Sequence, residues 1–234
     1  MSDLAPSLLR VENVGRRFTD GAVQALRAVT FSARAGETIA LTGPSGCGKS
    51  TLLSLIGLLD QPDEGRLLID GQDLACIRHG PAFRARHLGF VFQYHHMVST
   101  MTLQENVEAP MLALGVPPPA RRQRAAALLQ AMKLEHRAGF LPSHVSGGER
   151  QRAALARALV NHPRIVLADE PTGSLDSRNG RRVVELLIAH ARAEGALIVV
   201  ASHNPEVAEA LERRIALRDG ECVADSGAAP ITPP

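Results

Sequence analysis

β-forming residues gather in short clusters along the first third of the chain. They are bounded by glycine-containing turns and fall at 8–14, 29–33 and 38–41. Such clusters predict strands, so we expect the amino-terminal part to be rich in β-structure. Apolar positions at helical spacing predict a first helix over 49–58, and strand-like runs follow at 66–69 and 88–92.

The spacing of apolar positions becomes helical from about residue 102. Residues 120–133 are amphipathic, and the turn at 115–119, which holds three prolines, separates them from the helical pattern over 101–114. We expect these helices to form a subdomain, at about 95–150, that is inserted into the rest of the fold.

An alternation of strand and helix patterns resumes after this insertion. Continuous apolar runs at 165–168 and 196–201 alternate with helical patterns at 178–194 and 206–212. Strands that are apolar throughout belong in a parallel sheet that is covered by helices on both faces. The patterning therefore predicts an α/β fold.

Length and composition support one domain with a substantial core. The chain has 234 residues, of which 45% are hydrophobic, and we assign 7–225 to a single domain. Residues 226–234 include three prolines and are expected to be a disordered tail.

Charge and cysteine content exclude several classes of protein. The net charge of +2 gives no reason to expect a nucleic-acid partner, and the arginines at 121–124 read as a solvated helix face. The three cysteines form neither an even disulfide set nor a metal-ligand spacing, which fits a reducing compartment. No apolar run approaches the ~20 residues that cross a bilayer, and residues 1–6 do not resemble a secretory signal. We therefore expect no direct membrane insertion, and any membrane role must come through a partner chain.

A glycine-rich segment follows the strand predicted at 38–41. It reads Gly43-Pro44-Ser45-Gly46-Cys47-Gly48-Lys49-Ser50-Thr51 and fits the phosphate-loop pattern G-x-x-x-x-G-K-[ST] at every position. Glycines let backbone N–H groups turn toward phosphate oxygens, and the helix that begins near Gly48 carries an effective charge of roughly +0.5 at its first turn.

Lys49 adds a full positive charge for the β- and γ-phosphates, and the Ser50 hydroxyl is suited to bind Mg²⁺. The segment therefore predicts a nucleoside triphosphate site. One alternative is a glycine-rich helix cap, which the flanking strand and helix disfavour. The other is a dinucleotide fingerprint, which fails at Thr51.

Two acids end the apolar strand at 165–168, and they lie at the carboxyl edge of the predicted sheet, where open α/β folds bind ligands. Asp169 is suited to hold Mg²⁺ through its water shell, and Glu170 to orient or deprotonate an attacking water. Ser146, Gly147 and Gly148 open a second amphipathic run, which could be an anion site at a helix N-terminus or only a helix cap.

In their order and spacing these segments resemble the ATP-binding subunit of ATP-binding-cassette (ABC) transporters, from Leu8 to Val223. The resemblance implies a P-loop NTPase fold with a RecA-like parallel-sheet core, an N-terminal antiparallel β subdomain and an inserted α-helical subdomain. The segment at 88–96 and the glutamate at position 149 are most similar to the branch of lipoprotein-releasing, macrolide-export and cell-division ATPases.

The resemblance also implies roles for residues outside the phosphate loop. Gln93 matches the Q-loop glutamine that touches Mg²⁺ and the attacking water, and His203 matches the switch histidine. Segment 146–149 matches the family signature, and 174–176, which ends in Asp176, matches the D-loop. Phe18 stands where the family stacks an aromatic ring on adenine, although tyrosine is commoner there.

The resemblance further implies that ATP and Mg²⁺ bind between the phosphate loop of one subunit and Ser146, Gly147 and Gly148 of its mate, in a head-to-tail homodimer. Hydrolysis would then move integral membrane permease subunits that are contacted through about 93–105, at the cytoplasmic face of the membrane. The branch favours export or lipoprotein-type extraction. The alternative is a signalling ATPase that regulates a membrane or periplasmic partner without moving cargo.

Overall fold

The computed structural model describes residues 7–18, 23–173 and 175–227. The chain forms two compact units, one made of 1–77 and 197–234 and the other of 78–196.

An antiparallel sheet forms the amino-terminal part of the first unit. Its strands are β1 (Leu9–Phe18), β2 (Val23–Ala33), β4 (Glu64–Ile69) and β5 (Gln72–Asp73), in the order β2-β1-β4-β5. Apolar side chains such as Leu9, Val11 and Ile69 are fully buried or nearly so on one face. The predicted antiparallel β subdomain is confirmed, with β1 and β2 longer than the apolar clusters indicated.

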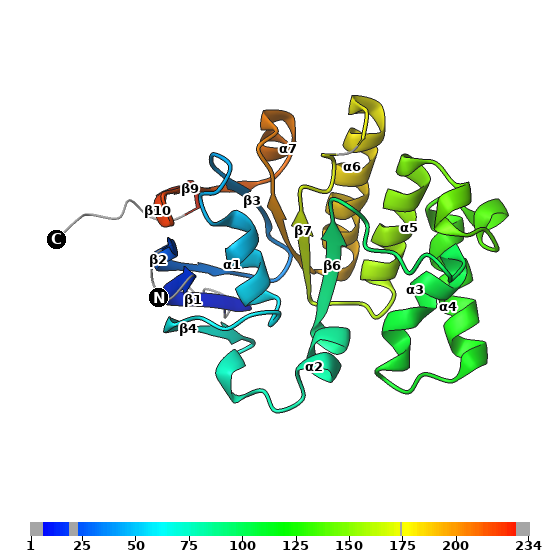
Figure 1. Cartoon of the computed structure of the whole chain (residues 1–234), viewed down its shortest axis with the longest axis horizontal. Coiled ribbons are helices and arrows are strands. Elements are labelled where there is room, and N and C mark those ends of the chain that lie inside the picture. Colours follow the sequence, from blue (N-terminus) through cyan, green and yellow to red (C-terminus); the bar gives the residue numbers. More distant parts are fainter. Residues whose placement is uncertain (1–6, 19–22, 174, 228–234) are drawn as a thin grey trace. The chain divides into compact units, whose positions relative to one another are not determined.

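The same unit holds a second group of paired strands. β3 (Thr38–Thr42) lies parallel to both β8 (Leu197–Ala201) and β9 (Arg213–Arg218), and β10 (Glu221–Asp225) pairs antiparallel with β9. All five residues of β8 are buried, as the continuous apolar run predicted. Helix α1 (Lys49–Ile56) follows β3, a 3₁₀ turn spans Leu74–Cys76, and α7 (Pro205–Glu209) follows β8 (Figure 1).

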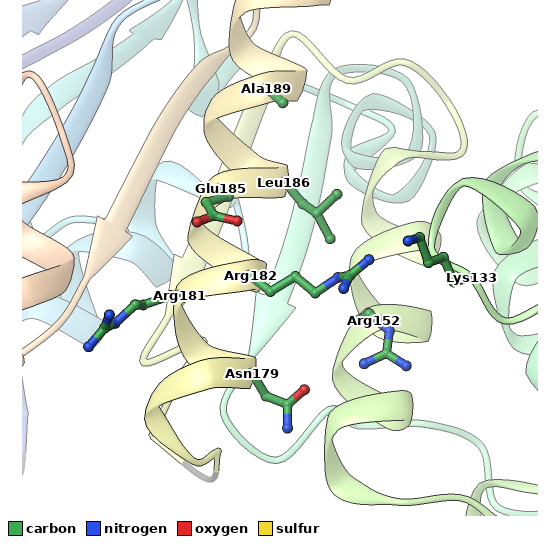
Figure 2. A pocket seen from close by; sticks show the side chains of 8 residues that line it. All are labelled: Lys133, Arg152, Asn179, Arg181, Arg182, Glu185, Leu186 and Ala189. Carbon is green, nitrogen blue, oxygen red and sulfur yellow. The ribbon is translucent and has the colours of Figure 1, made fainter.

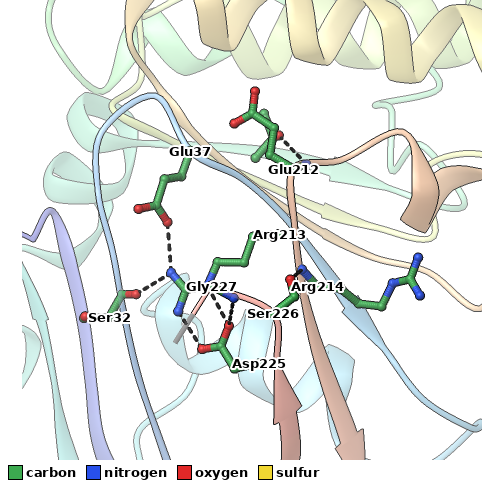
Figure 3. Close-up of polar contacts among 9 residues, drawn as sticks. Ser32, Glu37, Glu212, Arg213, Arg214, Asp225, Ser226 and Gly227 are labelled. Carbon is green, nitrogen blue, oxygen red and sulfur yellow. Dashed lines mark hydrogen bonds and ion pairs between the residues drawn. The ribbon is translucent and has the colours of Figure 1, made fainter. Parts of the chain in front are cut away.

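Arg213 ties β9 to its surroundings. Its guanidinium donates to both carboxylate oxygens of Asp225, at 2.8 and 2.6 Å, to Glu37 Oε2 at 2.9 Å, and to the Ser32 carbonyl at 2.7 Å (Figure 3). These hydrogen bonds raise the pKa of Arg213, and Asp225 contributes most. The ladder continues one residue past β10, where Ser226 N–H donates to the Arg214 carbonyl. Residues 228–234 of the predicted tail lie outside the described part of the chain.

The second unit combines two parallel strands with helices. β6 (Leu88–Phe92) and β7 (Ile165–Asp169) pair in parallel, in agreement with the apolar runs. The other elements are α2 (Gly80–His87), α3 (Leu103–Leu112), α4 (Pro118–Ala131), 3₁₀ turns at Glu135–Arg137 and Pro142–His144, α5 (Gly147–Leu159) and α6 (Ser177–Glu194). Helix α3 packs on α4 and on α5, and α5 packs on β6 (Figure 1). The α/β fold with a helical insertion is therefore confirmed.

Helix α2 and strands β9 and β10 are among the elements that the apolar pattern did not predict. Helix α2 buries none of its residues, so it lacks an apolar stripe. Strand β9 begins with two arginines and buries only Ile215 and Leu217, and β10 buries none of its residues. Their strand geometry depends on pairing with β3 and with each other, which local sequence does not reveal.

Candidate functional site

The phosphate loop joins the end of β3 to the start of α1, as its sequence predicts. Gly43, Gly46 and Gly48 have φ angles of 142°, 80° and 105°. A methyl group at Gly43 would stand 2.1 Å from the Leu217 carbonyl oxygen, and one at Gly48 would stand 2.5 Å from the Ala25 carbonyl oxygen. Only glycine can adopt these positive φ angles and also leave room for the nearby carbonyl oxygens. The glycines at positions 43 and 48 therefore determine the conformation of the loop.

Lys49 is almost completely buried, with 7% of its surface exposed. Its Nζ donates to the carbonyls of Gly43, at 2.8 Å, and Pro44, at 3.0 Å. Within the described part of the chain no carboxylate forms an ion pair with this ammonium. A buried cation with only neutral partners, beside the N-terminus of α1, creates a strong preference for an anion.

The remaining loop residues surround this cation. Pro44, Ser45 and Gly46 are exposed, Cys47 is buried with its Sγ 3.8 Å from Lys49 Nζ, and Ser50 is exposed on the first turn of α1. The loop is therefore open to an incoming ligand along one rim.

His203 lies at the end of the strand next to this loop. It follows β8, which pairs with β3, and it is exposed, while the neighbouring Ser202 is buried. A cavity of about 270 Å³ is lined by His203 together with Thr42 and Gly43. The fold thus brings the predicted switch histidine to the start of the phosphate loop.

Phe18 ends β1 and exposes 39% of its surface. The Arg16 guanidinium carbon stands 4.9 Å from the centroid of the Phe18 ring. A cation beneath an exposed aromatic ring leaves the ring surface available for stacking.

In the second unit, Gln93 lies beside Asp169 and Glu170 at the carboxyl ends of two neighbouring strands. Phe92 at the end of β6 is in register with Asp169 at the end of β7, so Gln93 follows beside Asp169 and Glu170. Glu170 has a φ of 44°, a conformation that costs a residue with a side chain about 1–3 kcal/mol. The surrounding structure therefore holds the backbone of the predicted catalytic acid in a conformation that it would not adopt by itself.

The predicted signature segment begins α5. Ser146 is the N-cap, and its Oγ accepts from Glu149 N–H at 3.2 Å, while Glu149 Oε2 accepts from Ser146 N–H at 2.8 Å. These bonds, with the help of Arg137, hold the pKa of Glu149 below its ordinary value. Ser146 is therefore a helix cap, and the exposed N-terminus of α5 also keeps the geometry of an anion site.

Asp176 is the N-cap of α6, and through Asn179 it is linked to the signature segment at 146–149. Its carboxylate accepts from Asn179 N–H at 3.0 Å and from Asn179 Nδ2 at 2.6 Å. A methyl group at Gly148 would stand 3.2 Å from Asn179 Cγ. Asn179, which the sequence did not single out, thus links the D-loop acid to the signature glycine. Ser174 lies outside the described residues.

A second residue that the sequence did not reveal is Arg157 on α5. Its guanidinium donates to the carbonyls of His95 and His96, which have φ angles of 61° and 44°. Burial lowers the pKa of His95, so this side chain is neutral at pH 7. From sequence alone, an arginine in an amphipathic helix is expected to be solvated. Only the fold shows that Arg157 holds the loop that follows Gln93.

Comparison with known families gives one clear match. A family model described as "ABC transporter" matches residues 26–173. The macrolide export ATP-binding/permease protein MacB of Brucella melitensis is 46% identical over 223 residues, which are 94% of this chain and 34% of that protein. The chain therefore spans about a third of the length of this relative.

Another relative matches along its whole length. The lipoprotein-releasing system ATP-binding protein LolD of Granulibacter bethesdensis is 42% identical over 227 residues, with 95% of this chain and 99% of that protein covered. Among solved structures, a dimeric ATP-binding cassette in a post-hydrolysis state, bound to ADP and Pi, has a TM-score of 0.86 and 37% identity. That match covers 93% of this chain and 97% of the solved chain.

Proposed function

This chain belongs to the ABC transporter family, and we propose that its predicted site residues hydrolyse ATP to drive a separate membrane permease. It is an ATP-binding and ATP-hydrolysing protein of the branch that includes macrolide-export and lipoprotein-releasing proteins. The observation that carries the site proposal is the buried Lys49 ammonium, which lies on a phosphate loop without an acidic partner among the described residues.

ATP is the substrate of the phosphate loop. Backbone N–H groups of the loop and of the first turn of α1 bind its phosphate oxygens, and Lys49 neutralises the β- and γ-phosphates. Thr51 extends the same turn, and Phe18 stacks on adenine.

Three of the predicted site residues carry oxygen atoms that suit Mg²⁺. The Ser50 hydroxyl, the Asp169 carboxylate and the Gln93 amide oxygen are hard donors, which fits a magnesium ion and not a softer metal. When bound, Mg²⁺ supplies charge neutralisation at the β- and γ-phosphates.

Glu170 acts on the water that attacks the γ-phosphate. Its carboxylate orients that water and accepts its proton. Gln93 and His203 position the water and the γ-phosphate. These roles are electrostatic, because phosphoryl transfer needs positioning and charge stabilisation more than covalent chemistry.

A second copy of the chain completes the site. The exposed N-terminus of α5, with Ser146, Gly147 and Gly148, binds the γ-phosphate of the ATP that its mate holds, and Asp176 lies beside it. The dimeric state of the similar cassette bound to ADP and Pi supports a head-to-tail homodimer.

The segment 93–105 is the proposed contact for the permease. Tyr94 exposes 73% of its surface and Val98 exposes 45%, while Arg157 fixes the backbone between them. Exposed apolar side chains on a fixed loop suit a protein contact. No helix in the described part of the chain is long and apolar enough to cross a bilayer. By its similarity to the lipoprotein-releasing system ATP-binding protein, we place the chain at the cytoplasmic face of the membrane, where it drives export or lipoprotein-type extraction.

The test compares the wild-type chain with Glu170→Gln. Phosphate release and size-exclusion chromatography are measured with and without ATP and Mg²⁺. We expect Glu170→Gln to bind ATP, to remain a dimer, and to lose at least about 100-fold in turnover. Glu135→Gln changes an exposed glutamate of the same unit and serves as the control, with wild-type turnover.

Turnover of Glu170→Gln at the wild-type rate would overturn the assignment of the catalytic acid. Transport is separated from signalling by reconstituting the chain with its membrane partner in vesicles. ATP-dependent movement of cargo supports the permease role, whereas ATP turnover that changes only a periplasmic activity of the partner contradicts it.

A further inference from the structure

A basic groove lies in the second unit, and one of its lining residues, Asn179, also binds Asp176 of the proposed ATP site. The groove has a volume of about 1000 Å³ and is lined by Lys133, Arg152, Asn179, Arg181, Arg182, Glu185, Leu186 and Ala189. Helix α6 supplies most of these side chains, α5 supplies Arg152, and Lys133 lies two residues beyond the end of α4 (Figure 2).

Three cations converge in the groove. Figure 2 shows the Arg182 and Lys133 side chains reaching toward each other from opposite sides, with Arg152 nearby, whereas Arg181 points away from them. Arg152 Nε donates to the Met132 carbonyl at 3.1 Å. Burial lowers the pKa of Arg152, and the nearby Arg182 charge lowers it further. These like charges therefore repel one another inside the fold.

The described residues offer this cluster little negative charge. Glu185 is the one carboxylate among the lining residues. Glu149 favours the charged form of Arg152, but its carboxylate already binds Ser146 and Arg137. The side chains of Arg182 and Lys133 form no ion pair or hydrogen bond with another described residue. The groove thus has an excess of positive charge.

The groove also has an apolar end. Asn179, Arg182, Leu186 and Ala189 follow one another at spacings of three and four residues, so they share one face of α6. Leu186 and Ala189 extend that face beyond the cations. No aromatic side chain lines the groove, so it offers no stacking surface for a base.

From this combination we propose that the basic groove binds an acidic amphipathic segment of a partner protein. Carboxylates of that segment pair with Arg182, Lys133 and Arg152, and its apolar side chains cover Leu186 and Ala189. The occupant would contact α5 and α6, whose N-termini carry Ser146 and Asp176. This inference does not depend on ATP hydrolysis, and it assigns a partner site distinct from the permease contact.

The experiment uses a fluorescein-labelled peptide in which glutamates and leucines alternate at helical spacing. Its binding to the full chain is measured by fluorescence anisotropy at low and high salt. We expect Arg182→Glu to weaken binding at least about tenfold and Lys133→Gln to weaken it about threefold. Arg124→Glu, which reverses an exposed charge on α4, is the matched control and should bind within about twofold of wild type.

Two further arms identify the ligand chemistry. A peptide with glutamine in place of every glutamate should lose binding, and pyrophosphate should compete only at concentrations far above that of the peptide. Equal binding of the glutamine peptide, or an unchanged affinity of a folded Arg182→Glu variant, overturns the proposal. Displacement by pyrophosphate at peptide-like concentrations also overturns it, because the groove would then select small phosphate anions. Thermal unfolding of each variant verifies that it is folded.

Discussion

The side chain of Gln93 lies against Gly173, in the turn that follows Glu170. A methyl group at Gly173 would stand 2.9 Å from Gln93 Nε2 and 3.3 Å from its Cδ. The turn is closed by a hydrogen bond from Gly173 N–H to the Glu170 carbonyl, at 3.1 Å. The missing side chain of Gly173 therefore leaves the space that the Gln93 amide fills beside the proposed catalytic acid.

Gly173→Ala should displace Gln93 and slow hydrolysis without unfolding the chain. Gly173 does not have a positive φ, and the atom that would move is the end of a flexible side chain, so the folding cost is small. We expect a loss of about tenfold or more in kcat with little change in the affinity for ATP. Gly139→Ala is the control, because a methyl group there meets no atom within 4 Å. Equal kcat values for the two variants would contradict a positioning role for Gln93.

Gly48→Ala should abolish ATP binding and destabilise the first unit. Gly48 has a φ of 105°. A methyl group added there would stand 2.5 Å from the Ala25 carbonyl oxygen and 2.7 Å from Leu26 Cδ2. Gly36 has a φ of 78°, but a methyl group there would meet no atom within 4 Å. Gly36→Ala is therefore a control that measures the conformational cost alone, about 1–2 kcal/mol. Nucleotide affinity and urea unfolding are compared for both variants. Retention of ATP binding by Gly48→Ala would mean that the loop can shift to make room.

Arg213→Met should reduce stability far more than loss of an exposed ion pair. The Arg213 side chain is 13% exposed and that of its partner Asp225 is 4% exposed, so the substitution leaves a buried carboxylate without its main cation. We expect a loss of about 3–5 kcal/mol in the free energy of unfolding. Arg17→Met, which breaks an exposed pair with Glu64, should cost about 0–1 kcal/mol. Urea denaturation distinguishes these outcomes, and equal costs would show that the Arg213 cluster is not structural.

Acid should weaken the cap of α5 through Glu149. The pKa of this carboxyl is lowered in the folded chain, so the stability it contributes is fully present above its ordinary value of 4.5. That stability is lost as the pH falls through the lower pKa of the folded state. The advantage of wild type over Glu149→Gln should therefore stay under about 1 kcal/mol at pH 7 and shrink as the pH falls below 4.5. Unfolding curves at several pH values test this, and a constant difference at all pH values would contradict it.

Alkylation of Cys47 should block ATP binding slowly. The thiol is buried in the phosphate loop, whereas Cys76 is exposed, so N-ethylmaleimide should label Cys76 first. Loss of ATP binding should follow the slower reaction and be absent in Cys47→Ser. A Cys76→Ser variant should remain sensitive. If Cys47→Ser is inhibited at the wild-type rate, modification of the loop is not the cause.

Local sequence was sufficient to predict an element wherever the residues of one short segment determine its conformation. The phosphate loop needs glycine at positions 43 and 48, and the strands at 88–92 and 165–169 are apolar enough to be buried. Their residue types therefore predicted both the nucleotide site and the parallel strands. The same signals could not find β9 and β10, in which charged residues flank short apolar runs, and β9 depends on pairing with the distant β3.

What the sequence by itself determined is the chemistry: a phosphate loop with Lys49 and Ser50, and two acids at the end of a strand. Only the tertiary structure decided which side chains hold those groups in place. Arg157 binds two carbonyls some 60 residues away in the chain, Gln93 fills the space beside Gly173, and Lys133, Arg152 and Arg182 converge from three segments. Contacts between distant segments depend on how the elements pack, and an arginine or lysine on a helix has the same local pattern whether it is solvated or gathered into a site.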